Sequence, residues 1–162
     1  FRRNEIVSLD YDDLDFVAEG LKINLKRSKT DKFGEGLVKG LPYFDNSQYC
    51  PVLTLKKWIE VSNINSGPLF RRFSKGSKLT NNRLTDQTVA LLIKKYLKLA
   101  GIESKNYSGH SLRSGFATSA AESGVEERNI MAMTGHKSPE MVRRYIKEAN
   151  LFKNNPLNKI KI

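Results

Sequence analysis

The first quarter of the chain consists of short apolar runs separated by polar turns. Residues 1–9 have apolar positions spaced as on one face of a helix, and they predict the end of a helix. Residues 14–18 and 21–25 are two apolar runs with a glycine between them, a pattern typical of a β-hairpin. Residues 37–44 predict a third strand, and Pro42 indicates that this strand lies at an edge or ends there.

Helical spacing follows. Pro51 is typical of a first helical turn and predicts a helix to about Val61. Residues 62–84 are rich in Ser, Asn and Gly and predict loops. Thr85 is a good N-cap and Gly101 a good helix end, and the apolar positions between them keep the spacing of an amphipathic helix.

The last third of the chain predicts three more helices. The first is capped by Ser111 and ends near Gly124, and the second covers residues 125–134. The third begins at the sequence Ser-Pro-Glu at 138–140, which offers a cap, a proline and an acid in the first turn. We therefore predict one α+β domain that is mostly helical, with a small three-stranded antiparallel sheet near the N-terminus packed on it.

The charge of the chain indicates its class of partner. It has 162 residues, 28 Lys and Arg against 17 Asp and Glu, and a net charge of +11. Such an excess attracts polyanions, of which nucleic acid is the commonest. No apolar run is long enough for a transmembrane helix, so no membrane partner is expected. With one Cys and two His, a disulfide framework is excluded and a structural zinc site is not expected.

Both histidines follow a glycine, and they stand at fixed distances from an arginine and a tyrosine. His110 lies one helical turn before Arg113, His136 follows 23 residues later, and Tyr145 follows after nine more. Arginine forks onto phosphate oxygens, histidine exchanges protons near neutral pH, and tyrosine can be a nucleophile. Together these groups suit attack on a phosphodiester without a metal.

Several segments resemble the tyrosine recombinase (phage integrase) family. Residues 109–118 are similar to its His-x-x-Arg box, and residues 133–138 and 142–146 to its Gly-His box and nucleophile segment. Residues 1–6 resemble its first arginine box, with the pattern apolar-Arg-x-x-Glu-apolar, and residues 26–31 its β-hairpin lysine box. The resemblance covers residues 1 to about 150, essentially a whole catalytic domain.

The resemblance implies a role for each matching residue. Tyr145 would attack the scissile phosphate and form a 3′-phosphotyrosyl bond to DNA. Arg2 and Arg113 would hold the non-bridging oxygens and stabilise the transition state. Lys29 would protonate the departing 5′ oxygen.

The other matching residues would assist. His110 would help proton transfer at the tyrosine, His136 would hydrogen-bond the phosphate, and Glu5 would support the first arginine and its loop. The family implies no cofactor and no metal. The spacing to Glu5 favours Arg2 over Arg3, and the sequence Arg-Ser-Lys-Thr favours Lys29 over its neighbours, Lys26 and Lys32.

The resemblance also implies a domain plan and partners. Residues 1–150 would be the catalytic domain and 151–162 a C-terminal tail. Because the chain opens at Phe1 within a helical pattern, we expect a fragment that lacks the family's N-terminal DNA-clamping domain. The partners would be double-stranded DNA, a homotetramer formed on it, and accessory DNA-bending or directionality factors. Leu151 and Phe152 would pack on their own domain or on a neighbour.

Three functions agree with these features. The favoured one is a site-specific recombinase or integrase of a bacterial phage or mobile element, cytoplasmic and associated with the nucleoid. A type IB topoisomerase-like enzyme would use the same chemistry to nick and close DNA. A catalytically inactive DNA-binding module would keep the fold, but it would have no need to keep the full set of site residues.

Overall fold

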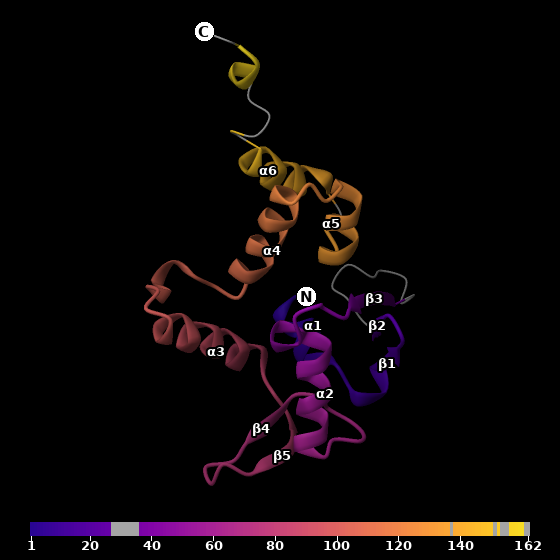
Figure 1. Ribbon diagram of the computed structural model, residues 1–162. Coiled ribbons are helices and arrows are strands. Elements are labelled where there is room, and N and C mark those ends of the chain that lie inside the picture. Colours follow the sequence, from indigo (N-terminus) through magenta and orange to yellow (C-terminus); the bar gives the residue numbers. More distant parts are fainter. Residues whose placement is uncertain (27–35, 137, 151, 153–155, 161–162) are drawn as a thin grey trace. The chain divides into compact units, whose positions relative to one another are not determined.

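The computed structural model describes residues 1–26, 36–136, 138–150, 152 and 156–160 (Figure 1). These residues divide into two compact units. One unit contains Arg3–Leu91, and the other contains Phe1–Arg2 together with Leu92–Ile162. Lys29 lies outside the described residues.

The unit Arg3–Leu91 is built on a three-stranded antiparallel sheet. A short helix, α1 (Arg3–Ser8), precedes the strands β1 (Leu14–Val17), β2 (Gly20–Leu25) and β3 (Leu37–Pro42), which are ordered β1-β2-β3. The predicted sheet is thus confirmed, with Pro42 at the end of an edge strand. Gly20 is required at its turn, because its φ is +154° and a Cβ there would lie 2.1 Å from the Leu41 carbonyl oxygen.

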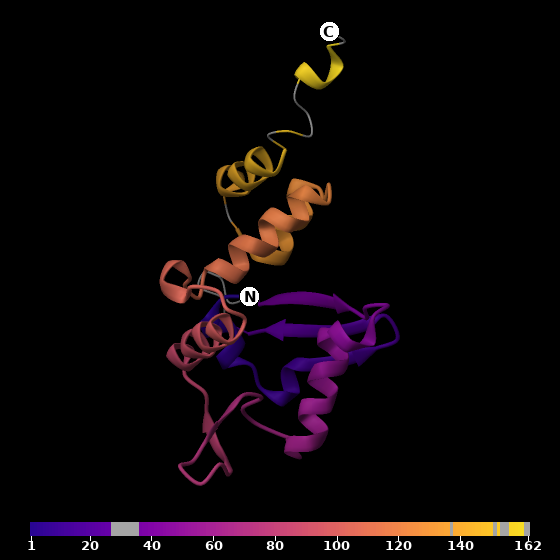
Figure 2. The ribbon, with the colours of Figure 1, turned by 60° about the vertical axis from the view of Figure 1, so that its left-hand side comes forward.

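Helix α2 (Pro51–Ser62) crosses one face of this sheet (Figure 2). Alternate residues of β2 are buried, namely Leu21, Ile23 and Leu25, as expected for a strand with one face in the core. Val52 of α2 is also fully buried. The Trp58 indole nitrogen donates a hydrogen bond to the Leu69 carbonyl oxygen at 3.0 Å, which fixes the chain after α2 against this helix.

A second, two-stranded sheet lies where the sequence predicts only loops. Strands β4 (Arg71–Phe73) and β5 (Leu79–Arg83) pair antiparallel. They are short and have no buried residue, so they show no apolar alternation in the sequence. Arginines bind across the hairpin instead: Arg71 donates to the Asn81 side chain at 2.8 Å, and Arg72 to the Arg83 carbonyl oxygen at 3.0 Å.

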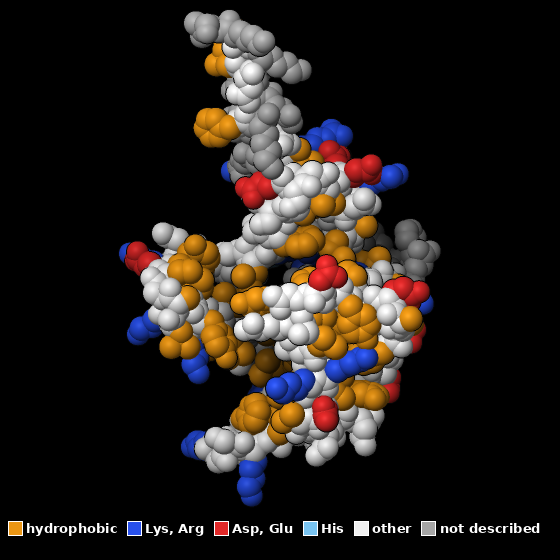
Figure 3. Space-filling view, viewed as in Figure 1, with side chains coloured by type: hydrophobic (Ala, Val, Ile, Leu, Met, Phe, Trp, Pro, Cys, Tyr) orange, Lys and Arg blue, Asp and Glu red, His pale blue; other side chains and the backbone are white. Residues whose placement is uncertain are grey.

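Helix α3 (Asp86–Leu99) has the predicted start and end. The Thr88 backbone nitrogen donates to the Thr85 hydroxyl at 3.3 Å, and Gly101 has a φ of +72°. No residue of α3 is buried, and apolar side chains gather over it in Figure 3. The most exposed of them are Leu91, Tyr96 and Leu99.

Three helices pack together at the C-terminal end, namely α4 (Ser111–Glu122), α5 (Glu127–Thr134) and α6 (Pro139–Ala149) (Figure 1). Their buried core consists of Ala117, Ala121, Ile130 and Val142. Ser138 caps α6 as predicted, because its hydroxyl accepts a hydrogen bond from the Glu140 nitrogen at 3.2 Å. The predicted cap of α4 is wrong by one position.

The N-cap of α4 is His110, and Ser111 is the first helical residue. The Ser111 hydroxyl points back instead and accepts a hydrogen bond from the Ser108 nitrogen at 2.9 Å. This bond closes the turn before the helix. It thereby fixes the backbone that carries His110.

Four 3₁₀ turns complete the described structure, at Tyr11–Asp13, Ser47–Tyr49, Ser104–Asn106 and Pro156–Lys159. Phe152 is 78% exposed, so it does not pack on its own domain in this structure. Leu151 lies outside the described residues. None of the described helices is long and apolar enough to cross a membrane.

Candidate active site

The start of α4 carries two of the predicted site residues. His110 occupies the N-cap and its side chain is exposed, whereas Arg113, one turn later, is only 8% exposed. Helical spacing places the two side chains on one face. The permanent charge of Arg113 is thus held in a partly desolvated place, where its attraction for an anion is stronger than on an open surface.

Arg2 reaches the end of α5, although 133 residues separate the two in the sequence. Its Nη2 donates a hydrogen bond to the Gly135 carbonyl oxygen at 3.1 Å. Gly135 ends α5 in the left-handed conformation, with a φ of +65°, which glycine adopts without strain. The bond therefore holds the Arg2 guanidinium beside the residue that precedes His136.

His136 is half-buried, and its Nδ1 lies 2.9 Å from the Thr134 hydroxyl oxygen. Its pKa is lowered from the ordinary value of 6.5, first by burial and then by the positive charges of Arg113, Arg2 and His110. This set of groups, from the start of the chain, α4 and the end of α5, is close enough to interact electrostatically. Together they form a cationic cluster.

Tyr145, on α6, lies beside this cluster. Its ring is half-buried against the core of the three helices, and its centroid is 6.4 Å from that of the His136 ring. Its hydroxyl oxygen is 3.2 Å from the Ser114 hydroxyl oxygen. Because Ser114 directly follows Arg113, this bond joins the tyrosine to the helix that carries the arginine.

Two residues of this site, Ser114 and Thr134, are not predicted from the sequence. Ser114 directly follows Arg113 in the His-x-x-Arg segment, and Thr134 lies two positions before His136 in the Gly-His segment. A hydroxyl beside a charged candidate is a signal for such a role. However, only the packing of the helices decides which atom the hydroxyl meets.

The structure brings together Arg2, His110, Arg113, His136 and Tyr145. Arg2 rather than Arg3 makes the contact with Gly135. Arg3 belongs to the unit Arg3–Leu91, and its guanidinium lies 3.9 Å from the carboxylate of Asp86 in the same unit.

Glu5 belongs to α1 of the unit Arg3–Leu91, where it is 2% exposed. Burial of a carboxylate requires hydrogen-bonding or ionic partners, and the role of Glu5 as a support for the first arginine stays a prediction.

The half-buried hydroxyl of Tyr145 beside fixed cations is suited to attack on a bound phosphate. The arginines can bind a phosphate through paired N–H donors, and the tyrosine oxygen is a nucleophile in the same place. Within the described ranges, no three His, Cys, Asp or Glu side chains are grouped so that they could hold a metal ion.

Comparison with known proteins agrees with this arrangement. The family model described as the phage integrase family matches residues 1–151. The chain belongs to this family. Over 160 residues it is 44% identical to an integrase/recombinase xerD homolog of Selenomonas ruminantium, and the match covers 99% of this chain and 47% of that protein.

Two solved structures share the fold of this phage integrase family member. A XerA recombinase superimposes with a TM-score of 0.70 at 24% identity, over 99% of this chain and 54% of the other. A XerH site-specific recombinase bound to palindromic difH substrate, in a post-cleavage complex, gives 0.68 at 20% identity, over 95% and 42%. The chain thus spans about half the length of these proteins. The predicted family and α+β fold class are confirmed.

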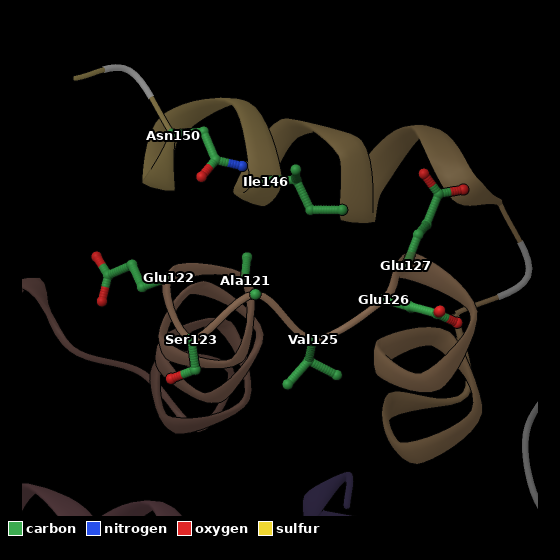
Figure 4. A pocket seen from close by; sticks show the side chains of 9 residues that line it. Ala121, Glu122, Ser123, Val125, Glu126, Glu127, Ile146 and Asn150 are labelled. Atoms are coloured by element: carbon green, nitrogen blue, oxygen red, sulfur yellow. The ribbon is translucent and has the colours of Figure 1, made fainter. Parts of the chain in front are cut away.

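A separate hollow of about 480 Å³ lies between the end of α4, the start of α5 and α6 (Figure 4). Apolar side chains line it, namely Ala121, Val125 and Ile146, and three glutamates stand around it, namely Glu122, Glu126 and Glu127. Glu126 pairs with Arg128 at 2.6 Å and Glu127 with Arg143 at 2.9 Å, so the rim carries paired charges of both signs. None of the residues that line this hollow is one of the predicted site residues.

Proposed function

We propose that this chain is the catalytic part of a site-specific DNA recombinase that cleaves and rejoins DNA through a 3′-phosphotyrosyl intermediate. Family membership supports an enzyme that breaks and rejoins DNA. The observation that carries the covalent step is the Tyr145 hydroxyl, 3.2 Å from Ser114 on the helix of Arg113 and beside His136.

In the proposed cleavage step, the Tyr145 oxygen attacks the phosphorus and the bond from phosphorus to the 5′ oxygen breaks. The tyrosine proton leaves with the help of His110, and the departing 5′ oxygen takes a proton from Lys29. Rejoining is the reverse, because a 5′ hydroxyl attacks the phosphotyrosine and releases Tyr145. The covalent bond conserves the energy of the broken ester, so no nucleotide cofactor is required.

The cationic cluster stabilises the charge that develops on the phosphate. Arg113 and Arg2 would donate to the non-bridging oxygens, and His136 would hydrogen-bond one of them. These donors are already fixed, Arg113 by burial and Arg2 by Gly135, so little reorganisation accompanies the reaction. The charge that a metal ion would supply is thus provided by side chains, and we propose that cleavage is metal-independent.

The decisive experiment is capture of the covalent intermediate. A pool of short duplexes of random sequence, each with a nick that lets the cleaved fragment diffuse away, is incubated with the chain in EDTA. A protein–DNA adduct that survives denaturation is expected, because the tyrosine ester needs no metal. Sequencing the trapped DNA would also reveal the preferred site.

Cleavage that appears only when Mg²⁺ is added would contradict this mechanism and indicate a metal-dependent nuclease. A chain that binds the duplexes but gives no adduct with or without Mg²⁺ would instead support the inactive DNA-binding module. A denatured sample of the chain serves as the control for adventitious cross-linking.

The general acid is proposed to be Lys29 rather than its neighbour Lys26. The Lys26 ammonium lies 2.6 Å from the buried carboxylate of Asp13, and this hydrogen bond raises the pKa of Lys26. A lysine that holds its proton more tightly and is already paired is a poorer proton donor. This pairing favours Lys29, in agreement with the sequence pattern.

Lys29→Met is expected to slow cleavage of ordinary DNA by about 10²-fold or more, the usual contribution of a positioned acid. A duplex whose bridging 5′ oxygen is replaced by sulfur should be cleaved at nearly the normal rate, because a thiolate leaves without protonation. Lys32→Met is the matched control. The assignment to Lys29 would be refuted if Lys29→Met cleaved both duplexes equally slowly. It would also be refuted if Lys32→Met were the variant whose slow cleavage the sulfur substitution restores.

Assembly on DNA is proposed to use the C-terminal segment, residues 151–162, and the hollow of Figure 4. This segment contains apolar side chains, such as those of Leu151 and Phe152, that would contact the apolar lining of the hollow. The segment of one copy would lie in the hollow of the next. Because copies with a charge of +11 repel one another until phosphates neutralise them, we propose a homotetramer that forms on double-stranded DNA.

The proposed domain plan places catalysis in residues 1–150 and the docking segment in 151–162. The biological setting that we favour from the sequence is a phage or mobile element. The Xer names of the relatives favour recombination of chromosomal DNA instead. The trapped DNA sequences distinguish the two, since they match either mobile-element junctions or a single chromosomal site.

A further inference from the structure

The hydroxyl of Thr134 has two close partners. Its oxygen lies 2.5 Å from the Ile130 carbonyl oxygen and 2.9 Å from His136 Nδ1. Two oxygens approach to 2.5 Å only when a proton lies between them, and a carbonyl has none to give. Thr134 therefore donates its single proton to Ile130, one turn earlier in α5.

The hydrogen bond from Thr134 to Ile130 determines which ring nitrogen of His136 carries a proton. Because the Thr134 proton is already engaged, its oxygen can only accept from the imidazole, and Nδ1 must carry a hydrogen. A neutral imidazole has one N–H group, so Nε2 then has a lone pair and no hydrogen. Only the doubly protonated ring can donate from Nε2.

We propose that Thr134 is a positioning residue that holds neutral His136 as the Nδ1–H tautomer, so that His136 donates to a phosphate oxygen only as an imidazolium. This inference rests on the proposed phosphate contact of His136. It adds that engagement of the phosphate is accompanied by uptake of one proton.

The surroundings of His136 agree with such coupling. Charged groups act on it from α4 and the start of the chain, namely Arg113, His110 and Arg2, and Tyr145 of α6 is its neutral aromatic neighbour. The three positive groups, added to burial, lower the pKa of His136 in the free protein. A phosphate among them supplies negative charge and raises that pKa again.

The first test is the tautomer itself, measured by ¹⁵N NMR of the imidazoles. The chain has only two histidines, so His110→Asn leaves the signal of His136 alone. Above the pKa, we expect a protonated Nδ1 and an unprotonated Nε2. Thr134→Ser should keep this tautomer, whereas Thr134→Val, of the same shape, should lose the preference for it.

An Nε2–H tautomer in the otherwise unchanged chain would overturn the proposal, and this measurement needs no variant at Thr134. Retention of the Nδ1–H tautomer in a folded Thr134→Val would also overturn it. Circular dichroism establishes whether that variant is folded. If it is not, the comparison passes to Thr134→Ser, whose loss of the tautomer would equally contradict the proposal.

The second test is proton uptake. Binding of a duplex from the trapped pool is measured by fluorescence anisotropy between pH 8 and pH 6, in the Tyr145→Phe background so that no covalent adduct forms. Affinity should rise as the pH falls, by at most about tenfold per pH unit for one linked proton. The matched variant His136→Gln donates without titrating, so in a His110→Asn background it should remove this component.

The outcomes separate this proposal from the proposed function. Covalent adducts together with an Nε2–H tautomer would refute the role of Thr134 and leave the recombinase intact. An Nδ1–H tautomer in a chain that forms no adduct would refute the recombinase and leave the hydrogen-bond assignment standing. An unchanged pH dependence in His136→Gln would refute the coupling to phosphate.

Discussion

Tyr145→Phe is expected to abolish the covalent protein–DNA adduct, with a loss of at least about 10³-fold, because the attacking oxygen is removed. The ring that packs on the core of α4, α5 and α6 is kept, and only the hydrogen bond to Ser114 is lost. The free energy of unfolding should therefore fall by only about 1 kcal/mol. Adducts are measured on denaturing gels and unfolding by thermal melts.

A matched control is Tyr96→Phe, since Tyr96 lies on α3 and is 65% exposed. This variant should form adducts as the unchanged chain does. Undiminished adduct in Tyr145→Phe would show that another residue is the nucleophile. Peptide mapping of the adduct would then identify that residue.

Arg113→Ala is expected to slow cleavage by about 10²-fold or more at saturating DNA, because one fixed donor to the transition-state phosphate is worth about 3 kcal/mol. Arg113 is only 8% exposed, so its charge acts where solvent screens it little. Binding of DNA should weaken far less, since many other basic groups contribute to it. Single-turnover cleavage and anisotropy measure the two effects.

Arg128→Ala removes the same formal charge from an exposed position on α5, where Arg128 pairs with Glu126 at 2.6 Å. This control should cleave DNA at the normal rate. It would show that the position of Arg113, and not the loss of one positive charge, causes the slow cleavage. Normal cleavage by Arg113→Ala, accompanied by lost affinity, would refute its role in the transition state. Thermal melts of both variants exclude unfolding as the cause of a slow rate.

The elements with strong local signals are predicted well. The hairpin glycine, Pro51 and the cap Thr85 each mark a boundary through a local backbone preference, and the structure confirms all three. The hairpin β4–β5 is missed because its strands are short, polar and exposed, and cross-strand arginines hold it together. Such contacts depend on pairing and leave no periodic trace in the sequence.

The candidate site likewise has residues that the sequence indicates and contacts that it does not. Motif spacing indicates His110, Arg113, His136 and Tyr145, and the structure places them in one cluster, while their roles stay predictions. The hydrogen bonds of Ser114 and Thr134 are not foreseen. A serine or threonine within a helix has several possible partners, and the tertiary packing of α4, α5 and α6 selects among them.

The small residues in the core of the three helices have a consequence for how this site tolerates change. Ala117 and Ala121 of α4 are buried in the same cluster as Val142 of α6, and α6 also carries Tyr145. A larger side chain at Ala117 would push α6 away from α4, since close-packed interiors do not absorb added volume. The displacement would be a fraction of the width of the new side chain. The tyrosine oxygen would move with the helix. Substitutions at these alanines should therefore change the reaction rate more than the fraction of folded protein. Such substitutions would alter turnover even though every reacting group stayed the same.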